Sequence, residues 1–173
     1  IEAKIRGLGR STAMRLELDL THQFTFGLQG STYTNIDGET VNCTTGDALA
    51  IFTDSHTITG SSTTVDNSNG TLAFNRTNLE AAERLFDNMV NNNDIKVVPE
   101  PDTIITSADQ AIVNVVKEFL RSVDAPDTAE RATNVYKAKY NHIILPYLNT
   151  TNLGGPTATG RYYWMLADLK KKD

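Results

Sequence analysis

The chain has 173 residues, of which 39% are hydrophobic and 21% charged, and this composition is typical of one globular domain or two small lobes rather than of a disordered chain. Its net charge of -5 argues against a dominant electrostatic grip on nucleic acid, and its single cysteine, Cys43, excludes an internal disulfide framework. No apolar run comes near the roughly eighteen residues that a membrane-spanning helix needs.

A long helix is predicted over residues 2–26. Apolar or small side chains recur there at helical spacing, at Ile5, Leu8, Thr12, Leu16 and Leu20. Met14 and Leu18 add a second apolar edge, and Arg6 and Arg10 form an exposed basic strip. Such a helix would be about 35 Å long, which is longer than the average helix of a globular protein.

Residues 27–75 are dominated by Gly, Ser, Thr and Asn, and they predict extended loops with one or two short strands. The dipeptide Asp37-Gly38 is a hairpin-turn signal. A stretch of this length with little regular structure is typical of a functional loop or an interaction arm.

A second helix is predicted over residues 78–90, with Asn78 as its N-cap. A short strand is expected at 95–98 and another at 103–106. Ser107 is expected to cap a third helix that ends at Ser122. The side chains predicted to face inward from this helix are Ile112, Val115, Val116, Phe119 and Leu120.

The last third of the chain predicts strands. "NVYKAKY" (134–140) alternates in character, and "HIILPYL" (142–148) and "RYYWMLAD" (161–168) are rich in β-branched and aromatic residues. Trp164 is expected in the core, where a helix would cover it. The predicted fold class is α+β with segregated helices and strands, and no internal repeat is visible.

The stretch "TDSHTITG" (53–60) places Asp54, Ser55 and His56 in a row, which are the side-chain types of a hydrolase triad. Triad members meet in space rather than in sequence, and neighbouring side chains of an extended segment point to opposite faces. Ser55 also lacks the two flanking glycines of a nucleophile elbow. A polar loop is therefore the favoured interpretation, and a thiol pair of Cys43 with His56 is a weaker alternative.

Other motifs favour no cofactor or metal. His22, His56 and His142 lie far apart without a second histidine nearby, so we expect two surface histidines and one in a strand rather than a metal site. "GLGRST" (7–12) begins like a dinucleotide fingerprint but follows no strand and lacks the third glycine. Four Asn-x-Thr triplets are interpreted as chance in a chain rich in these residues, and they begin at Asn42, Asn69, Asn75 and Asn149.

The order of several phrases resembles the major capsid proteins of tailed bacteriophages. These phrases are "GDALAIFTDSHTITG" (46–60), "NLEAAERLFDNMV" (78–90), "KVVPEPDTIITSADQAIVNVVKEFLRS" (96–122), "NVYKAKYNHIILPYLN" (134–149) and "RYYWMLAD" (161–168). Within the first, "AIFTDSH" (50–56) resembles a small-apolar-Phe-Ser/Thr-x-x-His phrase of that family. Ala138 stands where the family often has glycine.

The resemblance implies the Hong Kong 97-type capsid fold. Residues 1–75 would then supply the spine helix and extended segments of the peripheral lobe, residues 76–168 the axial lobe, and residues 169–173 the start of a return to the peripheral lobe. The family's N-terminal arm and last strands have no counterpart here, so we expect a core fragment or a partial subunit that forms no closed shell alone. The side chains expected to be under-packed for that reason are Leu8, Leu16, Leu18 and Phe24.

The function that the resemblance implies is structural. The chain would associate with itself in hexamers and pentamers of an icosahedral head, assembled in the bacterial host cytoplasm, that encloses double-stranded DNA without sequence specificity. Scaffold, portal and decoration proteins are further expected partners, and no membrane, cofactor, metal or catalytic residue is expected. The alternatives are an encapsulin-like compartment shell and, from a different class, a hydrolase that uses Ser55 or Cys43.

Overall fold

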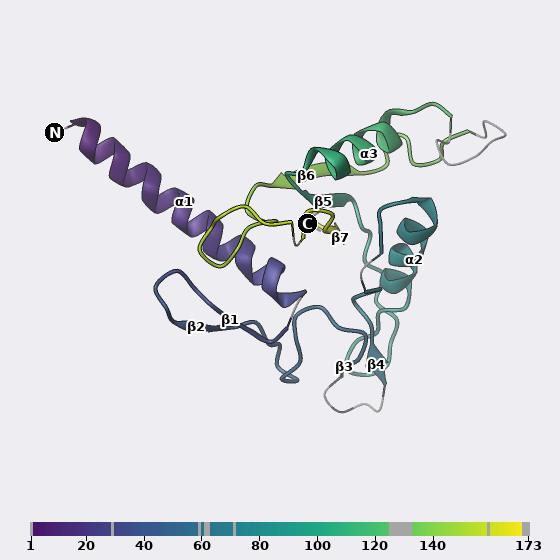
Figure 1. The fold of residues 1–173 in the computed structure, drawn as a ribbon. Coiled ribbons are helices and arrows are strands. Elements are labelled where there is room, and N and C mark those ends of the chain that lie inside the picture. The colour runs from purple at the N-terminus through teal and green to yellow at the C-terminus, as the bar shows by residue number, and fades with distance from the viewer. Residues whose placement is uncertain are drawn as a thin grey trace.

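The computed structural model describes residues 2–28, 30–58, 60, 63–70, 72–124, 133–158 and 160–170. Along the chain, a long helix is followed by short hairpins, and then by two helices that alternate with the strands of a small sheet (Figure 1). The α+β class predicted from the sequence is confirmed.

Helix α1 (Glu2–Gly27) confirms the predicted long helix. Its N-terminal half extends away from the rest of the molecule (Figure 1), and every side chain from residue 4 to residue 14 is exposed. Only its second half packs against the body. The side chains buried there are Leu18, Thr21, His22 and Thr25.

Two hairpins follow α1. Strands β1 (Thr32–Thr34) and β2 (Thr40–Asn42) pair antiparallel with Tyr33 opposite Val41. The turn between them contains Gly38 at a φ of 82°, in the left-handed region that glycine adopts without strain, so the predicted turn is confirmed. Strands β3 (His56–Thr57) and β4 (Thr64–Val65) form the second pair.

The central sheet has three strands in the order β6-β5-β7. The middle strand, β5 (Thr103–Ser107), pairs parallel with β6 (Asn141–Leu145) and antiparallel with β7 (Trp164–Ala167). Parallel neighbours need a crossover connection, and α3 (Gln110–Arg121) lies within it. The strands predicted at 103–106, within 142–148 and within 161–168 are therefore confirmed.

The main core lies between this sheet, α3 and α2 (Arg76–Asp87). Leu79, Ile104 and Val116 are fully buried in it. Phe119 is also buried, and Trp164 packs against the core while staying partly exposed. Phe74, just before α2, contacts the rings of both Phe119 and Trp164 at centroid distances of 5.4 and 5.3 Å.

Both helix starts differ from the prediction. The N-cap of α2 is Asn75, whose side chain accepts a hydrogen bond from the Asn78 amide, while the side chain of Asn78 donates to the Ala73 carbonyl. The N-cap of α3 is Asp109 rather than Ser107, because Ser107 is still in β5. In both places a second polar side chain three or fewer residues away takes the capping role.

Three further expectations are wrong. Val115 is 46% exposed, and Val113 takes its place on the inward face of α3. Residues 95–98 form only an isolated bridge between Val90 and Lys96. Residues 134–140 form turns instead of a strand, with Tyr136 and Tyr140 both buried.

Candidate functional site

His56, in β3, forms a compact polar cluster with Asp47. Its Nδ1 lies 2.9 Å from Asp47 Oδ2, and its Nε2 lies 3.0 Å from the carbonyl oxygen of Ile51. Asp47 also accepts hydrogen bonds from the Thr45 hydroxyl and from the amides of Leu49 and Thr57. The donors from Thr45 and His56 hold the pKa of the Asp47 carboxyl well below its usual range.

The neighbours Asp54 and Ser55 are exposed and lie outside this cluster. Both ring nitrogens of His56 are directed to Asp47 and Ile51, so neither is directed to Ser55. Cys43 is buried, and burial raises the pKa of its thiol, which disfavours the reactive thiolate. The structure thus brings together a carboxylate and a histidine, but not the row of three that the sequence suggested.

The other two histidines are held in the fold by packing and by secondary structure. His22 was expected at the surface but is buried, with its Nε2 2.9 Å from the Thr150 hydroxyl and its ring edge-on to Phe26 and Tyr33. His142 lies in β6, as expected for a strand histidine. Burial lowers the pKa of both rings, so the neutral imidazole is favoured. Within the described ranges, no group of three or more His, Cys, Asp or Glu side chains could hold a metal ion.

A second polar cluster, which the sequence did not reveal, surrounds Glu83 on α2. Its carboxylate accepts hydrogen bonds from the hydroxyls of Tyr136 and Tyr140 and from Lys139 Nζ at 2.6 Å. Lys139 Nζ also lies 5.1 Å from both ring centroids. Burial and the nearby carboxylate raise the pKa of Tyr136 to about 12 and that of Tyr140 further. The cluster fastens the 134–140 turns to α2.

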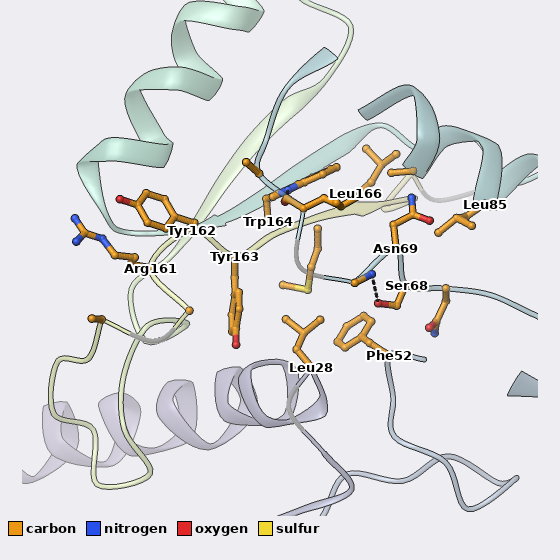
Figure 2. Close-up of a pocket in the computed structure, with 18 residues that line it drawn as sticks. Leu28, Phe52, Ser68, Asn69, Leu85, Arg161, Tyr162, Tyr163, Trp164 and Leu166 are labelled. Atoms are coloured by element: carbon orange, nitrogen blue, oxygen red, sulfur yellow. Dashed lines mark hydrogen bonds between the residues drawn. The ribbon is translucent and has the colours of Figure 1, made fainter. Parts of the chain in front are cut away.

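A groove of about 450 Å³ separates α2 from the end of α1 and the strand β7. Figure 2 shows Leu85, Leu28, Phe52 and Tyr163 around it. Trp164 borders the groove and donates from its Nε1 to the Leu72 carbonyl at 2.9 Å. The volume falls within the usual range of ligand pockets.

The groove lacks the converging charges of a reaction centre. The one charged residue among the described lining residues, Arg161, extends away from the groove in Figure 2 and pairs with Asp109 at 3.0 Å. Ser68 accepts a hydrogen bond through its Oγ from the Gly70 amide of its own loop. The rest of the described lining is mainly apolar and aromatic, with the polar side chains Asn67, Ser68 and Asn69 along one side, and this composition suits packing better than chemistry.

Comparisons with protein-family models, curated proteins and solved structures found no match. None of the three helices has the length and hydrophobicity needed to span a bilayer, as far as the chain is described.

The most unusual surface lies on α1. Four apolar side chains there point away from the buried face of the helix, and each is between 56% and 70% exposed. We call them the outer stripe, which consists of Ile5, Leu8, Leu16 and Leu20. They lie on the face of α1 where the sequence shows apolar residues at helical spacing, whereas the rest of the chain packs against the opposite face. Of the residues expected to be under-packed, Leu8, Leu16 and Phe24 are exposed, but Leu18 is buried next to Gly154.

Proposed function

We propose that the chain is a structural subunit of an icosahedral phage head with the Hong Kong 97-type fold, which associates with itself in hexamers and pentamers around double-stranded DNA. The observation that carries the proposal is the outer stripe of α1. A helix of 26 residues in which every side chain from residue 4 to residue 14 is exposed gains little stability from its own chain. Cover from other subunits would supply the missing packing.

The backbone at Ala138 supports the same proposal. Ala138 stands where the resembled capsid proteins often have glycine, and its φ is 56°, in the left-handed region that glycine favours. Its amide donates to the Leu120 carbonyl at 3.0 Å, which ties the turn to the end of α3. The position thus has the backbone conformation that explains the family's preference for glycine there.

The element order agrees with the division into lobes that the resemblance implies. Residues 1–75 hold α1 and the two short hairpins, and residues 76–168 hold the sheet with α2 and α3. In the proposed head, the first part forms the peripheral lobe, the second part forms the axial lobe, and residues 169–173 lead back to the periphery. Contacts of modest strength, repeated by symmetry, would stabilise the shell, and the net charge of -5 fits DNA held by confinement.

Negative-stain microscopy of the protein expressed from its complete reading frame tests the proposal. We expect round particles of uniform diameter, and a protein that stays below the size of a hexamer under all conditions contradicts it. Ultraviolet absorbance of purified particles from infected cells separates a DNA-filled head from an encapsulin-like shell that holds a protein cargo. Broad esterase and peptidase assays cover the remaining alternative, for which hydrolysis lost in Ser55→Ala or Cys43→Ala would overturn the proposal.

A further inference from the structure

We propose that the outer stripe of α1 pairs with the same stripe of a second copy of this chain, with the two helices antiparallel. The occupant of the exposed face is thus another α1. This inference goes beyond the proposed shell, because it needs only two copies and would hold for a protein that builds no shell.

The stripe is a continuous apolar surface along most of the helix. From Ile5 to Leu20 it runs for about 22 Å at the rise of an α-helix. Thr12 occupies the middle of the stripe, and its hydroxyl donates to the Leu8 carbonyl, so this polar group is satisfied within the helix. Residues four apart, as at Leu8, Thr12, Leu16 and Leu20, form the kind of ridge that packs into the groove of a second helix.

The other face of α1 is already used by its own chain. Thr25 donates to the Leu148 carbonyl at 3.1 Å, and His22 contacts Thr150. Leu18 packs near Gly154. Because the body holds this face through buried hydrogen bonds, the helix cannot roll over to cover the outer stripe without breaking them.

The distribution of charge along α1 favours a second α1 as the partner, in the antiparallel direction. Residues 2–14 of α1 carry three basic side chains, Lys4, Arg6 and Arg10, and one carboxylate, Glu2. Residues 15–27 carry two carboxylates, Glu17 and Asp19, and one basic side chain, Arg15, which pairs with Asp19 at 2.7 Å. The sequence has no further Lys or Arg before Arg76, so the second half is acidic on balance and the first half is basic. An antiparallel pair places the basic half of each helix beside the acidic half of the other, whereas a parallel pair places like charges together.

The antiparallel arrangement predicts one specific contact between a basic residue of one copy and an acidic residue of the other. Arg6 and Glu17 are eleven residues apart, which is about three turns, so they lie on the same side of the helix. In an antiparallel pair centred near Thr12, a two-fold axis brings Arg6 of each copy beside Glu17 of the other. The five N–H groups of a guanidinium allow this second acceptor beside the interaction that Arg6 makes within its own chain.

Cysteine cross-linking of the 173-residue chain tests the direction of the pair. The native Cys43 is buried, so an introduced thiol would be the accessible one. With a short bismaleimide, Thr12→Cys should cross-link to itself, because the two copies of residue 12 meet at the axis. Ile5→Cys alone should not, because its two copies would be about 20 Å apart, but a mixture of Ile5→Cys and Leu20→Cys should.

Self-cross-linking of Ile5→Cys and Leu20→Cys as efficiently as of Thr12→Cys would indicate a parallel pair and overturn the inference. Cross-linking at none of these positions would overturn it as well. Shells seen by microscopy without the Thr12→Cys cross-link would leave the proposed function standing and reject this interface. Cross-linked dimers from a protein whose complete reading frame forms no shells would support this interface and reject the proposed function.

Charge reversal measured by analytical ultracentrifugation tests the contact between Arg6 and Glu17. Arg6→Glu and Glu17→Arg should each weaken dimerisation about tenfold at low salt, because each replaces two attractive pairs with two repulsive pairs. The double variant Arg6→Glu/Glu17→Arg should recover most of the loss. Lys117→Glu is the control, because it reverses an exposed basic charge on α3, outside the proposed contact between the two copies of α1.

A chain that stays monomeric at about 100 μM, some hundredfold above a dissociation constant of about 1 μM, would overturn the inference. So would a double variant that associates no better than either single variant. If the basic half instead binds duplex DNA, Arg6→Glu and Arg10→Glu would reduce DNA binding equally while sedimentation stays monomeric, and this result would also reject the helix pair.

Discussion

At the scale of single residues, Asp47 is the group whose surroundings favour its charge most clearly. Four neighbours donate to or pair with it, namely Thr45, Leu49, His56 and Thr57, and its pKa lies well below the ordinary value. The unfolded chain therefore binds a proton at higher pH than the folded chain does. The contribution of Asp47 to stability is present above about pH 4, and it is lost as the pH falls below that value.

Asp47→Asn should consequently lower the free energy of unfolding at about pH 7, and the difference from the parent should shrink at about pH 3. Urea unfolding at the two pH values measures both effects. Asp54→Asn removes the same charge from an exposed neighbour and should change little at either pH. If Asp47→Asn lowers the free energy of unfolding equally at about pH 3 and at about pH 7, the charge of Asp47 is not what stabilises the loop.

Ala138 gives a prediction of the opposite sign. Ala138 has a left-handed conformation, which destabilises a residue with a Cβ by about 1–2 kcal/mol. Glycine avoids this penalty, but it loses more conformational entropy on folding, which offsets part of the stabilisation. Ala138→Gly should therefore raise the free energy of unfolding by about 0.5–1 kcal/mol. Ala81→Gly, inside α2, should lower it by about 1 kcal/mol. A loss of stability in Ala138→Gly comparable to that of the control would contradict the argument.

At the scale of elements, α3 provides the sharpest test of which face is inward. Phe119 is buried against Phe74 and Tyr136, so Phe119→Ala should cost about 3–5 kcal/mol, a large share of the about 5–15 kcal/mol of a typical domain. Val115→Ala, on the exposed side of the same helix, should cost less than about 1 kcal/mol. Chemical denaturation compares the two, and similar losses would mean that the inward face is wrongly assigned.

Helical spacing and turn chemistry predicted most elements. The existence of α1 follows from its spacing, and the β1–β2 turn follows from Asp37-Gly38. Which face of α1 is covered could not be predicted, because the body holds it through polar contacts of His22 and Thr25 rather than through the apolar stripe. Periodicity alone points to the wrong side of such a helix.

The strand predicted over residues 134–140 is wrong for a different reason. Its alternating character suggested a strand, but Tyr136 and Tyr140 both bind Glu83 on α2, which is more than fifty residues earlier in the chain. A contact of that range leaves no local signal in the sequence. The cluster of His56 with Asp47 joins residues only nine positions apart, and it was not predicted because the sequence pattern pointed to the adjacent Asp54 as the carboxylate.

At the scale of the whole molecule, the sheet with α2 and α3, which we propose as the axial lobe, should fold without the first part of the chain, and we expect this folding unit to begin before residue 76. Phe74 is part of the core, the Leu72 carbonyl accepts from Trp164, and the Leu169 amide donates to Asp102. A fragment of residues 72–170 should unfold cooperatively. A fragment of residues 76–168 loses Phe74 and should be less stable by about 3–5 kcal/mol.

Limited proteolysis of the 173-residue chain, followed by mass spectrometry, locates the same boundary. We expect a protected fragment that begins between residues 60 and 72, because the described residues between α1 and Leu72 form only short hairpins. A protected fragment that begins after residue 76, or equal stability of the two fragments, would show that Phe74 does not belong to the folding unit of the lobe.

The central claim is that copies of this chain build a shell, and cryo-electron microscopy of particles from the complete reading frame tests it most directly. The account predicts rings of five and six subunits, with residues 76–168 nearest the symmetry axes and residues 1–75 at the periphery. The helix α1 should lie within the shell wall, with Leu8 and Leu16 covered by another subunit. Particles in which α1 stays exposed to solvent, or a protein that forms no closed particle at all, would contradict the account.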